Sequence, residues 1–101
     1  MLKLPKFRAV YLFQQPVSMR WGEKKLTQVC QQEMGIEPKV GDAFLFFNAR
    51  RNEMKLLFRD EDGSNLFQKW MPRGGFMLPA PSEAERVTRL APNILESLFR
   101  K

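Results

Sequence analysis

The sequence predicts an α+β fold: an antiparallel β-meander with an N-terminal strand, one amphipathic helix after that strand, and short C-terminal helices. Three observations predict this class. Apolar residues recur with three-and-four spacing over residues 19–34, which is the period of a helix. Residues 43–79 hold closely spaced apolar runs separated by turn signals, the pattern of a meander. After residue 82 the spacing is helical again, so strands and helices are segregated along the chain.

The first two elements are a strand and a helix. RAVYLF, residues 8–13, is aromatic and β-branched, and Pro16 follows closely, which predicts a strand that ends before the proline. Ser18 is a favourable N-cap residue, so the helix is expected to begin immediately after it. Gly35 suits the position just beyond a helix C-terminus, which gives a predicted helix over residues 19–34.

The meander comes next. Its strands are predicted over residues 43–48, 54–60, 64–71 and 76–79. The connection ARRNE carries two arginines at its tip, and PRGG breaks the chain before the last strand. Closely spaced strands with tight connections favour antiparallel pairing. Helices are expected to cover one side of the sheet.

The C-terminal segment is predicted to be helical over residues 82–100. Ser82-x-x-Glu85 is a capping box, and apolar residues at helical spacing follow it. Pro92 interrupts this pattern, because a proline inside a helix loses a hydrogen bond and clashes with the preceding turn. We therefore expect two short helices or one kinked helix. The whole chain, residues 1–101, is predicted to be one domain with its core over residues 8–80.

The charge of the chain is strongly basic. The net charge is +6 and the pI about 9.9. Residues 1–25 contain six Lys or Arg against one acid, whereas the rest of the chain is nearly balanced. This excess favours a polyanionic partner such as nucleic acid or an acidic membrane surface.

Cysteine and histidine content limits the chemistry. The chain has one cysteine, Cys30, and no histidine, which excludes the usual zinc sites and histidine-based triads, and no cofactor is expected. A lone cysteine fits a reducing compartment. The N-terminus is too charged for a secretory signal, and no apolar run approaches the length of a membrane span. We therefore expect a cytoplasmic protein without membrane contact.

The stretch MKLLFRDEDGSNLFQKW predicts a hairpin with two chemically different faces. If the loop has three residues and Asp60 lies opposite Ser64, the core face carries Met54, Leu56, Phe58, Leu66, Gln68 and Trp70. The other face then carries Lys55, Leu57, Arg59, Asn65, Phe67 and Lys69. Two interpretations remain open: a surface for phosphates and bases, or a solvated face whose long cationic side chains shield apolar neighbours.

The acidic run Asp60-Glu61-Asp62 before Gly63 also has two interpretations. A two-metal nuclease needs carboxylates that converge from separate elements, and Asp42, Asp60 and Asp62 are the candidates for such a site. Consecutive acids at a turn point in different directions, and their spacing does not fit a calcium-binding loop. An Asp-Gly turn is the explanation that we favour, and no metal is expected.

Two segments in order, PVSMRWGEKKLTQV and PKVGDAFLFFNARRNEMKLLFRDEDGSNLFQKWMPRGGFMLP, resemble a known family. It is the small accessory protein, TnpB or the second-reading-frame protein, of bacterial insertion sequences of the IS-sixty-six group. The matching positions are Pro16, Val17, Met19, Arg20, Pro38, Gly41, Phe44 to Phe47, Asn48, Arg50, Arg51, Lys55, Leu56, Leu57, Asp60, Asp62, Gly63, Leu66, Lys69, Gly75, Phe76 and Pro79. Ser18 replaces a usual aspartate, and Arg59 replaces a usual aromatic residue.

The resemblance implies a role in transposition beside a separate, larger transposase that carries the strand-transfer chemistry, so no catalytic residues are transferred to this chain. Our leading hypothesis is a non-enzymatic accessory factor that contacts DNA. The candidate DNA-binding residues are Arg50, Arg51, Lys55, Arg59, Lys69 and Arg73, flanked by Arg20, Lys24 and Lys25. The alternative is an adaptor that docks the transposase or associates with itself. The sequence leaves the oligomeric state open.

Overall fold

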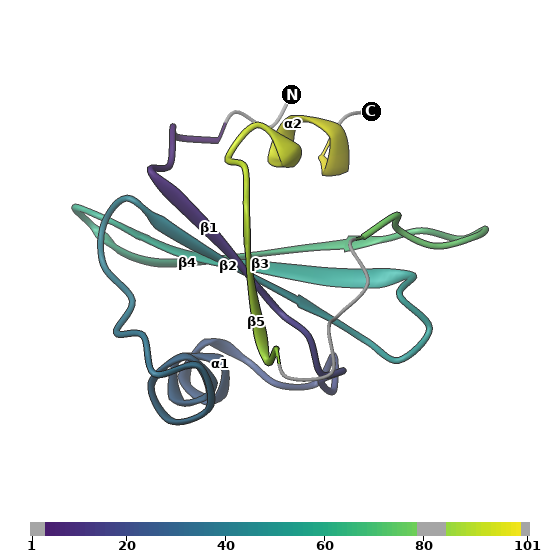
Figure 1. Ribbon diagram of the computed structural model, residues 1–101, viewed down its shortest axis with the longest axis horizontal. Coiled ribbons are helices and arrows are strands. Elements are labelled where there is room, and N and C mark those ends of the chain that lie inside the picture. Colours follow the sequence, from purple (N-terminus) through teal and green to yellow (C-terminus); the bar gives the residue numbers. More distant parts are fainter. Residues whose placement is uncertain (1–3, 79–84, 100–101) are drawn as a thin grey trace.

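One five-stranded sheet, of order β4-β3-β2-β1-β5, organises the computed structural model, which describes residues 4–78 and 85–99 (Figure 1). The strands are β1 (Ala9–Phe13), β2 (Asp42–Phe47), β3 (Glu53–Asp60), β4 (Gly63–Trp70) and β5 (Val87–Leu90). The helices are α1 (Glu23–Val29), its direct π-helical continuation η1 (Cys30–Met34), and α2 (Ile94–Leu98). The predicted α+β class is confirmed.

The strands combine a meander with one crossover. β2, β3 and β4 pair antiparallel with their neighbours, as predicted. β1 pairs parallel with β2, and β5 pairs antiparallel with the outer side of β1. A parallel pair cannot be joined by a tight turn and needs a crossover connection. Here α1 and η1 supply that crossover.

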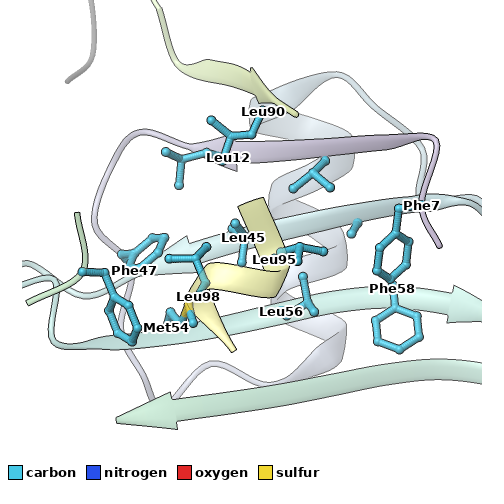
Figure 2. Close-up of a cluster of buried hydrophobic side chains, with 13 residues drawn as sticks. Phe7, Leu12, Leu45, Phe47, Met54, Leu56, Phe58, Leu90, Leu95 and Leu98 are labelled. Carbon is cyan, nitrogen blue, oxygen red and sulfur yellow. The ribbon is translucent and has the colours of Figure 1, made fainter. Parts of the chain in front are cut away.

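One face of the sheet is buried beneath α2. Leu12, Leu45 and Leu56 belong to the cluster on this face, and Leu95 and Leu98 of α2 complete it. Figure 2 shows the two α2 leucines lying over the strands. A helix of only five residues would not be stable alone in water, so burial of this apolar face is what stabilises it.

The opposite face is buried beneath α1 and η1. Phe44, Phe46 and Leu57 form the sheet side of this second cluster, and Leu26 and Val29 form the helix side. The expectation that helices cover one side of the sheet is therefore wrong, because α1 and α2 lie on opposite faces (Figure 1). The crossover between the parallel strands occupies one face, and the C-terminal helix covers the other.

The first helix begins later than predicted. Ser18 does not cap it: the Ser18 Oγ accepts the Arg20 backbone N–H at 3.2 Å and closes a turn. Gly22 stands at the N-cap, and Glu23 is the first helical residue. At the other end Gly35 has a φ of +71° and terminates η1, which confirms its predicted role.

The C-terminal segment differs from the helical prediction. Residues 87–90 form β5, since Val87 and Thr88 are β-branched and β1 has an open edge that they can pair with. Pro92 then lies in the turn before α2, where the Leu95 N–H donates to its carbonyl at 3.3 Å. The predicted capping-box residue Ser82 lies outside the described residues. None of the described helices is long and apolar enough to cross a bilayer.

The predicted fourth meander strand is also absent over residues 76–78, and Pro79 lies outside the described residues. Phe76 is buried, and its backbone N–H donates to the Arg51 carbonyl at 2.8 Å. This segment therefore packs on the β2–β3 loop instead of extending the sheet.

Candidate nucleic-acid interface

The β2–β3 loop, residues 48–52, is held by hydrogen bonds from its two asparagines. The Asn48 Oδ1 accepts the backbone N–H groups of Asn52 and Glu53, each at 3.1 Å. The Asn48 Nδ2 donates to the Asn52 Oδ1 at 2.7 Å. The sequence analysis did not assign a role to either asparagine. An asparagine that starts a turn is the signal that could have indicated this brace.

Arg50 and Arg51 occupy the tip of this braced loop. The Arg51 N–H donates to the Asn48 carbonyl at 3.0 Å, which closes the turn. Arg51 has a φ of +58°, the left-handed conformation that residues with a side chain seldom adopt. The loop therefore presents two neighbouring cations on a backbone that hydrogen bonds hold in one conformation.

The segment after β4 brings a third arginine to this loop. The Met71 N–H donates to the Asn52 carbonyl at 2.7 Å, which ties the start of the segment to the loop. Gly75 lies so close that a Cβ at this position would stand 3.1 Å from the Arg51 carbonyl oxygen. Glycine suits this position because the two backbones approach closely and a Cβ would be a tight contact. Arg73 lies between these two attachment points.

The segment after β1 ends at the same edge of the sheet. The Val17 N–H donates to the Phe47 carbonyl at 2.8 Å, so this segment passes beside the end of β2 at Val17. A pocket of about 180 Å³ lies here, lined in part by Pro16, Asn48 and Arg51. Arg20 is exposed on this segment.

We call Arg20, Arg50, Arg51 and Arg73 the arginine end of the sheet. Figure 1 shows the β2–β3 loop and the segment after β4 together at one end, with the β3–β4 turn at the other. Between described residues the ion pairs are Arg8–Asp42 and Arg86–Glu33, so none of these four arginines is neutralised by a carboxylate there. The three segments that carry these arginines are far apart in sequence, and backbone hydrogen bonds join them near one edge of the sheet.

The basic sheet face that the sequence analysis predicted does not form. Asp60 lies opposite Gly63 instead of Ser64, because the turn contains two residues and not three. A shift of one residue reverses the direction of every side chain along a strand. Lys69 consequently lies on the face opposite Lys55.

Lys55 is only 6% exposed, and its Nζ donates to the Trp21 carbonyl at 2.7 Å. It holds the segment before α1 to the sheet, which removes it from the candidate DNA contacts. Lys69 is half-buried and its Nζ donates to the Leu98 carbonyl at 2.7 Å beneath α2. Arg59 is half-buried at the end of β3 distant from the arginine end.

Lys24 and Lys25 lie at the start of α1, on the exposed side of the helix. The Lys25 Nζ stands 5.0 Å from the centre of the Trp21 ring, a cation–π contact. The segment before α1 is tied to β3 by the hydrogen bond from the Lys55 Nζ to the Trp21 carbonyl. The place of Lys24 and Lys25 in the candidate site stays a prediction.

The sequence of the chain matches a known protein family. Residues 8–100 match the family described as IS66 Orf2 like protein. This chain belongs to that family. Membership confirms the resemblance inferred from the sequence, and the family implies an accessory protein of an insertion sequence.

One curated relative of this IS66 Orf2-like chain is "Uncharacterized protein y4jC" of Sinorhizobium fredii. The two are 31% identical over 65 residues, which cover 64% of this chain and 56% of the relative. The matched region thus spans about half the length of that relative. No solved structure matches the chain.

Two of the three carboxylates considered for a metal site, those of Asp42 and Asp60, are occupied in structural contacts. Asp42 is buried and its Oδ1 accepts the Arg8 Nε at 3.0 Å; this contact raises the pKa of Arg8. The Asp60 side chain accepts the Asn65 amide at 2.9 Å and two backbone N–H groups of the turn. Across residues 4–78 and 85–99, no three His, Cys, Asp or Glu side chains are grouped so that they could hold a metal ion.

Cys30 lies in the cluster beneath α1 and is fully buried. Burial raises the pKa of its thiol to about 12, because the apolar surroundings disfavour the thiolate. The thiolate is the reactive form of cysteine. Cys30 therefore packs as a small apolar side chain, as its place on the apolar side of the predicted helix suggested.

Proposed function

We propose that this protein is a non-catalytic accessory factor of insertion-sequence transposition that contacts the DNA backbone through the arginine end of the sheet. Family membership supplies the context of transposition. The observation that supports DNA contact is that Arg50, Arg51 and Arg73 stand on two loops that are bonded to each other.

Three features suit these arginines to phosphate. Guanidinium groups match phosphate geometry and keep their charge at every physiological pH. The loops are braced, so little conformational freedom is lost when they bind. Arg50 and Arg51 are not paired with a carboxylate of the described residues, so their binding to phosphate breaks no ion pair there.

DNA binding is tested by fluorescence anisotropy with labelled duplex DNA. For a protein with several phosphate contacts, affinity falls steeply between about 50 mM and about 200 mM salt. The combined substitution Arg50→Glu and Arg51→Glu is expected to weaken binding for every DNA sequence by about tenfold or more and to lower the salt slope by about 2.

The matched control reverses the same number of charges at the opposite end of the sheet. Lys6 and Lys39 are exposed and precede β1 and β2, so Lys6→Glu with Lys39→Glu changes the net charge equally without altering the arginine end. This control is expected to retain affinity within about threefold. Equal losses in the two double variants would assign the binding to net charge and refute the proposed site.

A further inference from the structure

The outer edge of β4 is a long and regular strand edge without a neighbour among the described residues. β4 is the terminal strand of the sheet and pairs with β3 through eight consecutive residue pairs, from Glu53–Trp70 to Asp60–Gly63. Its other side therefore presents backbone N–H and C=O groups to solvent. Such an edge is a template for pairing with another strand.

β4 lacks the devices that usually block edge pairing. Natural edge strands are protected by prolines, bulges, short length or charged side chains. β4 contains no proline, and its register with β3 has no bulge. Its one cation, Lys69, is turned beneath α2 and donates to the Leu98 carbonyl. A neighbouring strand can approach without displacing a charge.

An exposed tryptophan stands on this edge. Trp70 is 60% exposed at the end of β4, although aromatic residues of this size are buried for most of their surface in folded proteins. A strand added beside β4 would cover part of this ring. Aromatic side chains are among those that stabilise strand pairs most strongly.

The two ends of β4 carry opposite charges. The β3–β4 turn contributes Asp60, Glu61 and Asp62 at one end, and Arg73 follows the strand at the other. We propose that β4 pairs antiparallel with β4 of a second copy of this chain, which places the acidic turn of each copy beside Arg73 of the other. Parallel pairing would instead bring like charges together.

Two-fold symmetry and charge select the register. In an antiparallel pair of identical strands, facing residues lie on the same side of the sheet, so the symmetry axis passes through one residue. When that residue is Phe67, Ser64 faces Trp70 of the second copy. The acidic turn that precedes β4, with Glu61, then comes nearest the segment that carries Arg73 of the second copy. The result is a continuous ten-stranded sheet.

The test is sedimentation velocity of the full chain, without DNA, over a range of protein concentrations. Wild-type protein is expected to form a dimer. Arg73→Glu and Glu61→Arg are each expected to weaken the dimer by about tenfold, because two symmetric attractive pairs become repulsive. The two substitutions combined restore opposite charges and are expected to recover the dimer.

The control is Lys39→Glu, which changes the net charge as Arg73→Glu does but lies away from β4; it should leave the dimer unchanged. Recovery in the double variant shows that the single variants fold. A wild-type monomer at every concentration, a dimer insensitive to both single reversals, or a double variant that stays monomeric would each overturn the inference. Because DNA is absent, these outcomes are independent of the proposed DNA contact.

Discussion

Arg51 adopts a left-handed backbone conformation at the tip of the β2–β3 loop, with a φ of +58°. For a residue with a side chain this conformation costs about 1–2 kcal/mol relative to the right-handed one. The Asn48 brace and the bond from the Phe76 N–H to the Arg51 carbonyl hold it in place. The arginine occupies a backbone position that suits glycine, and the surrounding hydrogen bonds offset the conformational free energy that this costs.

This conformation predicts different responses of the two loop arginines to glycine. Arg51→Gly relieves the left-handed strain, so it should be more stable than Arg50→Gly by about 1 kcal/mol, since Arg50 has no positive φ. Urea unfolding of both variants gives the comparison. Equal stabilities would show that the Arg51 backbone is not strained. Both variants should bind DNA more weakly than the wild type.

Lys55 is predicted to act in stability and not in binding. Lys55→Met keeps the apolar stem but leaves the part-buried Trp21 carbonyl without its donor, which should cost about 1–3 kcal/mol of unfolding free energy. DNA affinity at low salt should stay within about twofold of wild type. Lys39→Met, at an exposed site, serves as the control for loss of one charge. A stable Lys55→Met variant with weakened DNA binding would reverse this assignment.

Among the elements, the β3–β4 turn is stabilised by one carboxylate. Hydrogen bonds lower the pKa of Asp60 below its ordinary value of 3.8; the Asn65 amide is the main cause and the Asp62 and Gly63 N–H groups add to it. A lowered folded pKa means that the carboxylate stabilises the fold above its unfolded pKa. That stabilisation is lost as the pH falls through the lower folded value.

The pH dependence of this turn can be measured with a single substitution. Asp60→Asn cannot ionise, so the part of the acid destabilisation that Asp60 contributes below about pH 4 should disappear in this variant. Thermal unfolding followed by circular dichroism between about pH 6 and pH 2 reports it. Asp62→Asn, two residues further along the same turn, is the matched control. Parallel pH profiles for wild type and Asp60→Asn would contradict the role of this carboxylate.

Elements with strong local signals could be predicted from the sequence, and those decided by distant partners could not. The strands of the meander follow from alternating apolar runs, and Gly35 marks the helix end. Residues 87–90 carry helical spacing, yet they pair with β1, and only the open edge of that strand explains why. The hairpin register depended on whether Asp60 closes a turn of two or three residues, and the sequence suits both.

At the scale of the whole molecule, α2 is the part that covers the second face of the sheet. Leu95 is 3% exposed within that cluster (Figure 2). Leu95→Ala should therefore destabilise the protein by about 2–5 kcal/mol in urea unfolding. Ser97→Ala, on the exposed side of the same helix, should change stability by no more than about 0.5 kcal/mol. Similar effects of both substitutions would mean that α2 does not seal this face.

The candidate site could also be predicted only in part, because its residues have local signals but their arrangement depends on distant partners. Arg50 and Arg51 were selected from a basic turn, and Arg73 from a Gly-Gly stretch, without any indication that the two segments meet. The backbone bond from Phe76 to Arg51 is what joins them. Lys55 is in an equally basic stretch, but the helix packed over its face buries it. Sequence supplied the cations, and tertiary packing decided which of them face solvent.

The position of β5 beside β1 has a consequence for how the protein is made. Val10 of β1 pairs with Leu90 of β5. β1 therefore cannot complete this pairing until β5, 80 residues later in the sequence, is available. Pairs so distant in sequence form late, because a long loop must close first. On the ribosome, β1 therefore keeps an unpaired apolar edge until residues 87–90 have emerged. A stop codon shortly before Val87 would leave that edge open permanently, and the shortened chain would aggregate instead of folding.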